Sequence, residues 1–280
     1  LSSLGADFAE NSSGVPTAMV IDGAGRHAYV ASASGISQFD IASNGQVSAM
    51  ATPKVNAGPQ PASLTLDPKG RFAYVLNAVQ GRISVLPIAS NGSLGSATQA
   101  SVGSAPRAFA AESSGRFVYV INTFSSKISA FAVNQASGSL TAAGSVDTKK
   151  ALVNVEADAS GRFLYAVVLD VLRGKYSVNA YAIEANGSLT DKGSVAVDGS
   201  HAPTGLVPHP SGRFAYLALA NGALRTFTID AINGTLAATG NESAAPGTDV
   251  LSAAVDASGR FLVASTESGG PSWAPAAAAK

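Results

Sequence analysis

The chain has 280 residues, 46% of them hydrophobic and 13% charged, and its formal net charge is +0. Such a composition can bury a sizeable core, and a neutral chain without long runs of one sign argues against a basic face for nucleic acid. The lack of cysteine excludes disulfides, thiolate catalysis and cysteine metal sites, and no apolar run approaches the roughly 18 residues of a membrane span.

An internal repeat organises the chain. Its marker is a Gly-Arg pair, found at Gly25-Arg26, Gly70-Arg71, Gly115-Arg116, Gly161-Arg162, Gly212-Arg213 and Gly259-Arg260. Successive pairs are 45, 45, 46, 51 and 47 residues apart. A period near 45 is that of a four-stranded propeller blade, so we predict one all-β propeller domain over residues 1–280 with six four-stranded blades. Seven blades are less favoured, because a seventh would need about another 45 residues.

The second copy of the repeat shows the predicted elements in order. An apolar strand at 62–66 is followed by a tight turn at 67–70 and by an aromatic and β-branched strand at 72–77. An alternating strand at 83–88 leads into Asn91-Gly92, which is a hairpin signal, and then into a weaker fourth strand. No part of the chain has the pattern of a long amphipathic helix.

Residues of the repeated turn are predicted to build the blade. An acid stands three residues before the glycine in five copies, where its carboxylate can accept bonds from turn N–H groups: Asp22, Asp67, Glu112, Asp158 and Asp256. A tyrosine stands three residues after the arginine in five copies: Tyr29, Tyr74, Tyr119, Tyr165 and Tyr216. Because side chains alternate along a strand, this tyrosine and the arginine lie on opposite faces. Residues present in every copy are expected to be structural.

The two ends of the chain are predicted to share a blade. The last copy shows its first two strands near 251–255 and 261–265, and residues 3–12 align with the outermost strand of an earlier copy. We therefore expect the N-terminal strand to close the ring by joining the C-terminal blade, which removes an exposed edge. The third strand of that blade would come from about 272–278, where two prolines favour a three-stranded or irregular blade, or a tail over 271–280.

The repeat resembles a known family. The order Asp-x-x-Gly-Arg-Phe-x-Tyr-Val-x-Asn, Ile-Ser-x-Phe and Asn-Gly-Ser-Leu is similar to lactonase-type β-propellers, which include bacterial 6-phosphogluconolactonase and the carboxymuconate cyclase. It also resembles the Tyr-Val-Thr-Asn (YVTN) repeat propellers of bacterial and archaeal surface proteins. The resemblance covers almost the whole chain, and its motifs are specific for the architecture. It implies a β-propeller and, as an activity, lactone hydrolysis.

The resemblance also indicates where catalytic residues would lie. Lactonase-type propellers show Pro-Arg-His at the start of an inner strand and Asn-Glu at the end of a second strand. Here Arg107 is followed by Ala108, and no glutamate follows Asn122. Glu267 stands at the glutamate position of the final copy, with Ser252 at the corresponding histidine position. In a lactonase, Arg107 would hold an anionic group and Glu156 or Glu267 would act as general base.

Glu156 is an exception among the innermost strands. Other copies place small or apolar residues at its position: Val20, Thr65, Ala110, Val207 and Ala254. A charge in such a strand is expected to be paired or to face the tunnel. Asn154 lies on the same face, and Arg107 begins the neighbouring inner strand, so these residues could form a polar cluster. The alternative is a local salt bridge that orders the ring.

The fourth copy carries a sizeable insertion at 170–176, predicted to lengthen the loop between its second and third strands. Loops on a rigid scaffold often carry binding residues. The candidates for ligand or partner binding are Asp170, Arg173, Lys175 and Tyr176, together with Asn154. The alternative is an inert longer hairpin.

Two histidines are weak candidates for metal ligands. His209 replaces the turn acid in the fifth copy, and His201 lies eight residues earlier. No third ligand is placed by spacing, and a turn histidine is usually solvated. We therefore predict no metal site and no cofactor.

Three functions are compatible with these patterns. The first is a non-catalytic binding or structural propeller that engages a protein partner or a small ligand through loops at one mouth of the ring, with no nucleic acid and no membrane span. The second is a lactone hydrolase, and the third is a metal-dependent hydrolase. The Ala/Ser/Thr/Asn-rich, low-charge composition and the first residue, Leu1, favour a processed bacterial protein that is secreted, periplasmic or on the cell surface.

Overall fold

A computed structural model describes residues 16–198, 201–244, 250–256, 258–266 and 272–275. All of the elements in these ranges are β-strands, and neighbouring strands pair antiparallel. The described part of the chain contains no helix able to span a membrane. The residues fall in two compact units, Leu1–Val118 with Phe131–Ala142, and Tyr119–Ala130 with Ala143–Lys280.

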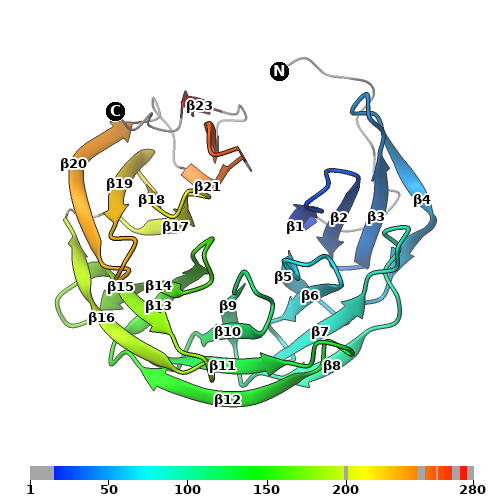
Figure 1. Ribbon diagram of the computed structural model, residues 1–280, viewed down its shortest axis with the longest axis horizontal. Coiled ribbons are helices and arrows are strands. Elements are labelled where there is room, and N and C mark those ends of the chain that lie inside the picture. Colours follow the sequence, from blue (N-terminus) through cyan, green and yellow to red (C-terminus); the bar gives the residue numbers. More distant parts are fainter. Residues whose placement is uncertain (1–15, 199–200, 245–249, 257, 267–271, 276–280) are drawn as a thin grey trace. The chain divides into compact units, whose positions relative to one another are not determined.

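The strands form one sheet per repeat, in chain order (Figure 1). The first sheet contains β1 (Pro16–Ile21), β2 (His27–Ser32), β3 (Gly35–Ile41) and β4 (Val47–Val55). The second contains β5 (Pro61–Leu66), β6 (Phe72–Asn77), β7 (Arg82–Pro87) and β8 (Thr98–Ser101). The third contains β9 (Pro106–Ala111), β10 (Phe117–Asn122), β11 (Lys127–Val133) and β12 (Leu140–Asp147).

The second unit holds the later sheets. The fourth contains β13 (Ala151–Ala157), β14 (Phe163–Asp170), β15 (Lys175–Ile183) and β16 (Leu189–Val197). The fifth contains β17 (Pro203–Pro208), β18 (Phe214–Leu219), β19 (Ala223–Ile229) and β20 (Leu236–Ala244). The last contains β21 (Val250–Val255), β22 (Phe261–Thr266) and β23 (Ser272–Pro275). Within this unit β13, β17 and β21, the first strands of three consecutive sheets, lie side by side (Figure 1).

Within each unit, consecutive sheets pack face to face through apolar residues. In the first unit Tyr29, Ala31 and Ile36 of the first sheet pack against Val75 and Leu86 of the second. In the second unit the fourth and fifth sheets share a core, and the fifth and last sheets share another. Burial on both faces explains why the second strand of each repeat is a continuous apolar run and not an alternating one.

The repeated turn is a backbone clip, as predicted. The Asp158 carboxylate accepts hydrogen bonds from the backbone N–H groups of Arg162 and Phe163 at 3.0 and 2.9 Å. The Asp67 carboxylate also accepts a hydrogen bond from the Arg71 guanidinium, with Nε 2.8 Å from Oδ2. In five copies the arginine lies over the ring of the phenylalanine that follows it: Phe72, Phe117, Phe163, Phe214 and Phe261. These contacts give the repeated arginines a structural role.

In three copies the repeated tyrosine also fastens its sheet to the next one. Its hydroxyl donates to the carbonyl of the hairpin glycine one repeat later, as seen for Tyr29 to Gly92 at 2.6 Å, Tyr119 to Gly187 at 3.0 Å and Tyr165 to Gly234 at 3.2 Å. The hairpin glycines have positive φ, as the predicted Asn-Gly turns require. Local turn chemistry and packing between sheets are therefore coupled.

Tyr74 is an exception that supplies a matched test. Its hydroxyl is buried and has no hydrogen-bond partner among the described residues, whereas that of Tyr29 bonds Gly92. We expect Tyr29→Phe to lower the free energy of unfolding by about 1 kcal/mol, because the Gly92 carbonyl loses its donor. Tyr74→Phe should be neutral or stabilising, because it removes an unsatisfied polar atom. Urea unfolding of both variants checks this, and equal losses would contradict it.

The C-terminal sheet agrees with the expected short blade. β23 pairs with β22 as the third strand of a three-stranded sheet, at the predicted position. The strand expected at 3–12 lies outside the described residues. The insertion of the fourth repeat differs from the prediction of a longer loop. β14 and β15 themselves extend to Asp170 and from Lys175, so only a four-residue turn separates them. Pairing between the added residues satisfies backbone groups that a loop would leave to solvent.

Candidate functional site

A cavity of about 460 Å³ lies in the second unit against the first strands of three consecutive sheets. β13 contributes Asn154 and Glu156, β17 contributes Thr204 and Val207, and β21 contributes Ser252. The cavity therefore brings residues from the first strands of three separate repeats onto one surface. A cavity of this size can accept a small organic molecule.

Glu156 is the ionisable side chain of this cavity. It is partly accessible from the cavity, yet the surrounding strands remove enough water to destabilise its charged form. This desolvation raises the pKa of Glu156 to about 8, although a hydrogen bond from the Asn154 side chain opposes the shift. The carboxyl therefore exchanges its proton near neutral pH, which suits a general acid or base.

Asn154 lines the same cavity, and the two ends of its side-chain amide differ in their hydrogen bonding. Its amide group bonds Glu156, while its Oδ1 is buried and finds no hydrogen-bond partner within the described residues. A buried carbonyl oxygen without a donor costs free energy. Asn154 and Glu156 both line the cavity, so an amide and a carboxyl that can hydrogen-bond a hydroxylated molecule lie side by side on its wall.

The raised pKa of Glu156 makes stability depend on pH. The folded chain holds this proton up to about pH 8, whereas the unfolded chain releases it near the ordinary value of 4.5. Between these values the folded state binds more protons, so its stability falls as pH rises. We expect Glu156→Gln to remove this loss, so that its stability relative to the natural protein rises by roughly 3 to 4 kcal/mol between pH 5 and pH 8. Urea unfolding at both pH values measures it, and a constant difference would contradict it.

The family follows from a comparison of sequences. The model described as "Lactonase, 7-bladed beta-propeller" matches residues 8–102, 45–155 and 103–252, which together span most of the chain. The chain belongs to this lactonase family. The match confirms the resemblance and the predicted all-β propeller fold with four-stranded sheets. A comparison with curated protein sequences gave no match.

Solved structures similar to this lactonase-family chain have diverse functions. A candidate 6-phosphogluconolactonase from Bacteroides uniformis is 19% identical, with a TM-score of 0.73 over 89% of this chain and 77% of its own. The periplasmic gluconolactonase PpgL of Pseudomonas aeruginosa is 20% identical, with a TM-score of 0.63 over 82% and 70%. Hydrazine synthase of Kuenenia stuttgartiensis is 16% identical, with a TM-score of 0.72 over 93% and 83%. At such identities the likeness shows the fold alone.

The sequence analysis also predicted Arg107 and Glu267 as catalytic candidates. Arg107 is an exposed residue of β9 in the first unit, and Glu156 belongs to the second. Glu267 lies outside the described residues, and Ser252 lines the cavity from β21.

The two candidate metal ligands are not brought together. His201 precedes β17 and is exposed, while His209 follows the same six-residue strand, so about 20 Å of extended chain separates them. The His209 ring bonds the Ser211 hydroxyl at 2.7 Å and the Gly259 carbonyl at 2.8 Å. It thereby fills the place of the turn acid in its own repeat and contacts the turn of the next.

The insertion forms a projecting hairpin tip in the second unit. Asp170 and Arg173 make a partly exposed ion pair at 3.6 Å, and Lys175 pairs with Asp170 in the strand register. Tyr176 packs against the core of the fourth and fifth sheets. Val171 and Leu172 at the tip are 69% and 99% exposed. The candidates of this segment therefore divide between the tip and the core.

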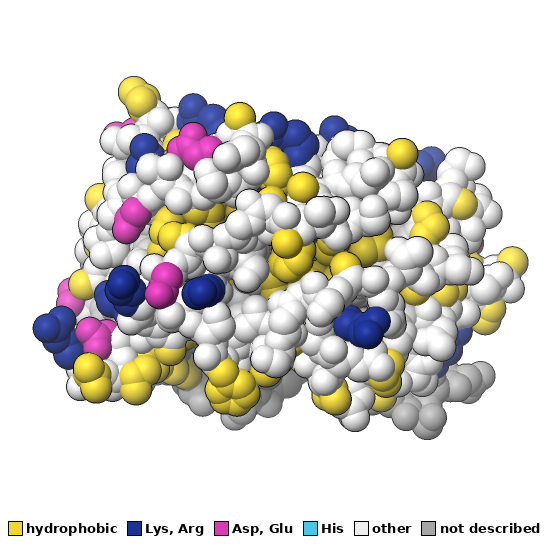
Figure 2. Space-filling model, turned by 90° about the horizontal axis from the view of Figure 1, so that it is seen from below, with side chains coloured by type: hydrophobic (Ala, Val, Ile, Leu, Met, Phe, Trp, Pro, Cys, Tyr) yellow, Lys and Arg dark blue, Asp and Glu magenta, His cyan; other side chains and the backbone are white. Residues whose placement is uncertain are grey.

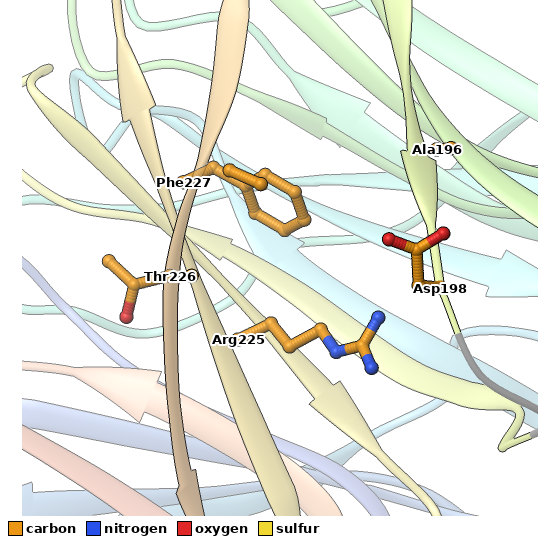
Figure 3. Close-up of a pocket in the computed structure, with 7 residues that line it drawn as sticks. Ala196, Asp198, Arg225, Thr226 and Phe227 are labelled. Atoms are coloured by element: carbon orange, nitrogen blue, oxygen red, sulfur yellow. The ribbon is translucent and has the colours of Figure 1, made fainter.

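A second cavity, of about 190 Å³, contains residues that the sequence analysis missed (Figure 3). It lies between the fourth and fifth sheets, and the side chains of Arg225 and Asp198 point toward one another across it. Arg225 stands where earlier repeats have a small polar residue: Ser37, Ser84, Ser129 and Asn179. Reading the third strand of each repeat position by position would have singled it out.

A third hollow, of about 400 Å³, belongs to the first unit and is lined by Arg26, His27, Lys69 and Arg71. Its side chains lie near acids, with Arg71 Nε 2.8 Å from Asp67 and His27 Nδ1 3.1 Å from Asp40. On the face in Figure 2, Lys and Arg side chains are separated by uncharged surface. The described surface in this view lacks the continuous basic patch of a nucleic-acid-binding protein.

Proposed function

We propose that this chain hydrolyses a small lactone in the cavity lined by β13, β17 and β21, with Glu156 as general base. The observation that carries the proposal is a carboxyl with a pKa of about 8 facing that cavity in a chain of the lactonase family. The pKa of a useful general base lies near the working pH. An ordinary surface glutamate would be too weak a base by comparison.

The chemistry needs one proton carrier. The ionised Glu156 takes a proton from a water molecule as the water oxygen forms a bond to the lactone carbonyl carbon. The tetrahedral intermediate then breaks the bond from this carbon to the ring oxygen, and Glu156 returns the proton to that oxygen. The product is the open-chain hydroxy acid, which ionises in water. Each turnover consumes one water molecule and leaves Glu156 in its starting state.

Asn154 has a positioning role in this scheme. Its amide donates to Glu156 and favours the ionised form. The hydroxyls of Thr204 and Ser252 line the same cavity. The product carboxylate forms beside Glu156, and repulsion between the two anions favours release.

Family membership favours hydrolysis over a purely binding propeller. The binding hypothesis rested on the absence of a histidine after Arg107 and of a glutamate after Asn122. Glu156 supplies an acid–base group from a different inner strand, so those absences do not remove acid–base chemistry from the chain.

We also propose that the propeller has six blades and that residues 3–12 close the ring. We further propose that the protein is secreted, periplasmic or on the cell surface.

The direct test is a panel of δ- and γ-lactones followed by acid release in a pH-stat. We expect turnover above the spontaneous rate for at least one sugar-derived δ-lactone. Absence of turnover across the panel, with a folded protein, would overturn the proposal in favour of the binding hypothesis.

A further inference from the structure

The charge of the cavity selects among lactones. Glu156 is the one ionisable side chain among its described lining residues. The remaining polar side chains are neutral and come from Asn154, Thr204 and Ser252, and the other lining residues are apolar or glycine. A ligand in this cavity therefore meets hydrogen-bonding groups and one acid, but no lining cation in the described part of the chain.

We propose that the substrate is an uncharged, polyhydroxylated lactone and that phosphorylated lactones are rejected. This inference rests on the proposed function and names the substrate class of the same site. It is carried by the neutral amide and hydroxyl groups that line the cavity around Glu156.

A phosphate group would be unfavourable here for two reasons. It carries about −1.5 to −2 charges at pH 7, and burying such an anion without a cation is costly. It would also raise the pKa of Glu156 further, because a neighbouring like charge disfavours the ionised carboxylate. A phosphorylated substrate would thus bind weakly and reduce the fraction of active base.

The chain does build a hollow lined by cations, which provides a contrast. Arg26, Lys69 and Arg71 gather in the hollow of the first unit, where acids of the repeated turns also lie. No equivalent side chain lines the Glu156 cavity within the described residues. The difference lies in the elements used, since the cations come from the turns and the cavity is lined by the first strands.

The test compares glucono-δ-lactone with its 6-phosphate at pH 6.5. We expect kcat/KM to be higher for the uncharged lactone by at least about tenfold, the ratio that corresponds to one modest like-charge interaction. Thr204→Lys adds a cation to the lining and should shift the ratio toward the phosphorylated lactone by about tenfold. Thr204→Gln, of similar length without charge, should leave the ratio unchanged. An equal or higher kcat/KM for the phosphorylated lactone would overturn the inference.

Binding of the corresponding lactams separates this inference from the proposed function. A lactam is not turned over on this time scale, so calorimetric binding of the uncharged and 6-phosphorylated lactams reports charge preference without catalysis. Absence of lactone turnover with tighter binding of the uncharged lactam would overturn hydrolysis and support the charge preference. Equal or tighter binding of the phosphorylated lactam, or no binding of either, would overturn the charge preference whatever the turnover.

Discussion

Glu156→Gln is expected to lower kcat/KM for lactone hydrolysis by at least about 100-fold, because a positioned general base contributes 10²–10⁴-fold. Glutamine cannot accept a proton from water, yet it has the shape and the neutral charge of the protonated glutamate that predominates at pH 7. Folding should therefore be preserved while activity is lost. Initial rates by pH-stat, with thermal unfolding of the same samples, measure both effects.

A matched control uses another acid of the same unit. Asp158 belongs to the turn after β13 and accepts backbone N–H groups, so Asp158→Asn should lower stability without removing the base. Retention of most activity in Glu156→Gln, or a comparable loss per folded molecule in Asp158→Asn, would contradict the role given to Glu156.

Gly234→Ala is expected to give the largest stability loss among the hairpin glycines described. Gly234 has a φ of 77°, and an added Cβ would overlap the Phe163 ring of the preceding sheet. Positive φ costs about 1 kcal/mol for alanine, and overpacking adds about 1–3 kcal/mol, so we expect a loss of roughly 2–4 kcal/mol. The same change also disturbs the carbonyl that accepts the Tyr165 hydroxyl. Chemical unfolding measures this loss.

Gly240→Ala provides the comparison. Gly240 has a nearly equal φ of 75°, and a Cβ built there meets nothing within 4 Å. Its substitution should cost only the backbone strain, about 1 kcal/mol. If the two variants were equally destabilised, the contact between the hairpin and the preceding sheet would not be the source of the larger loss.

The sequence predicted the repeat well because its signals are local. An acid, a glycine and an arginine within five residues determine one turn, and repetition showed that Asp67 and Arg71 are structural. The structural role predicted for the repeated tyrosine was likewise confirmed. Its bond to the glycine of the next repeat was not predicted, because that bond depends on the packing of two sheets. The insertion was misread because a loop and a longer hairpin have similar compositions, and backbone pairing decides between them.

The candidate site was only partly accessible to sequence reasoning. Glu156 and Asn154 were identified because they break the pattern of the inner strand. The cavity itself, and the desolvation that raises the pKa of Glu156, depend on three strands separated by about one repeat each meeting on one surface. Arg225 was missed although it also breaks a repeated position, because the third strand was read for its alternation alone.

The pH dependence of kcat/KM tests the central claim most directly. If Glu156 is the general base, kcat/KM for a neutral lactone, corrected for spontaneous hydrolysis, should rise with pH and level off above an apparent pKa of about 8. The residual kcat/KM of Glu156→Gln should not show this rise with pH. A rise in kcat/KM with an apparent pKa near 4.5 would contradict the assignment. So would a rise near pH 8 that is retained unchanged in Glu156→Gln.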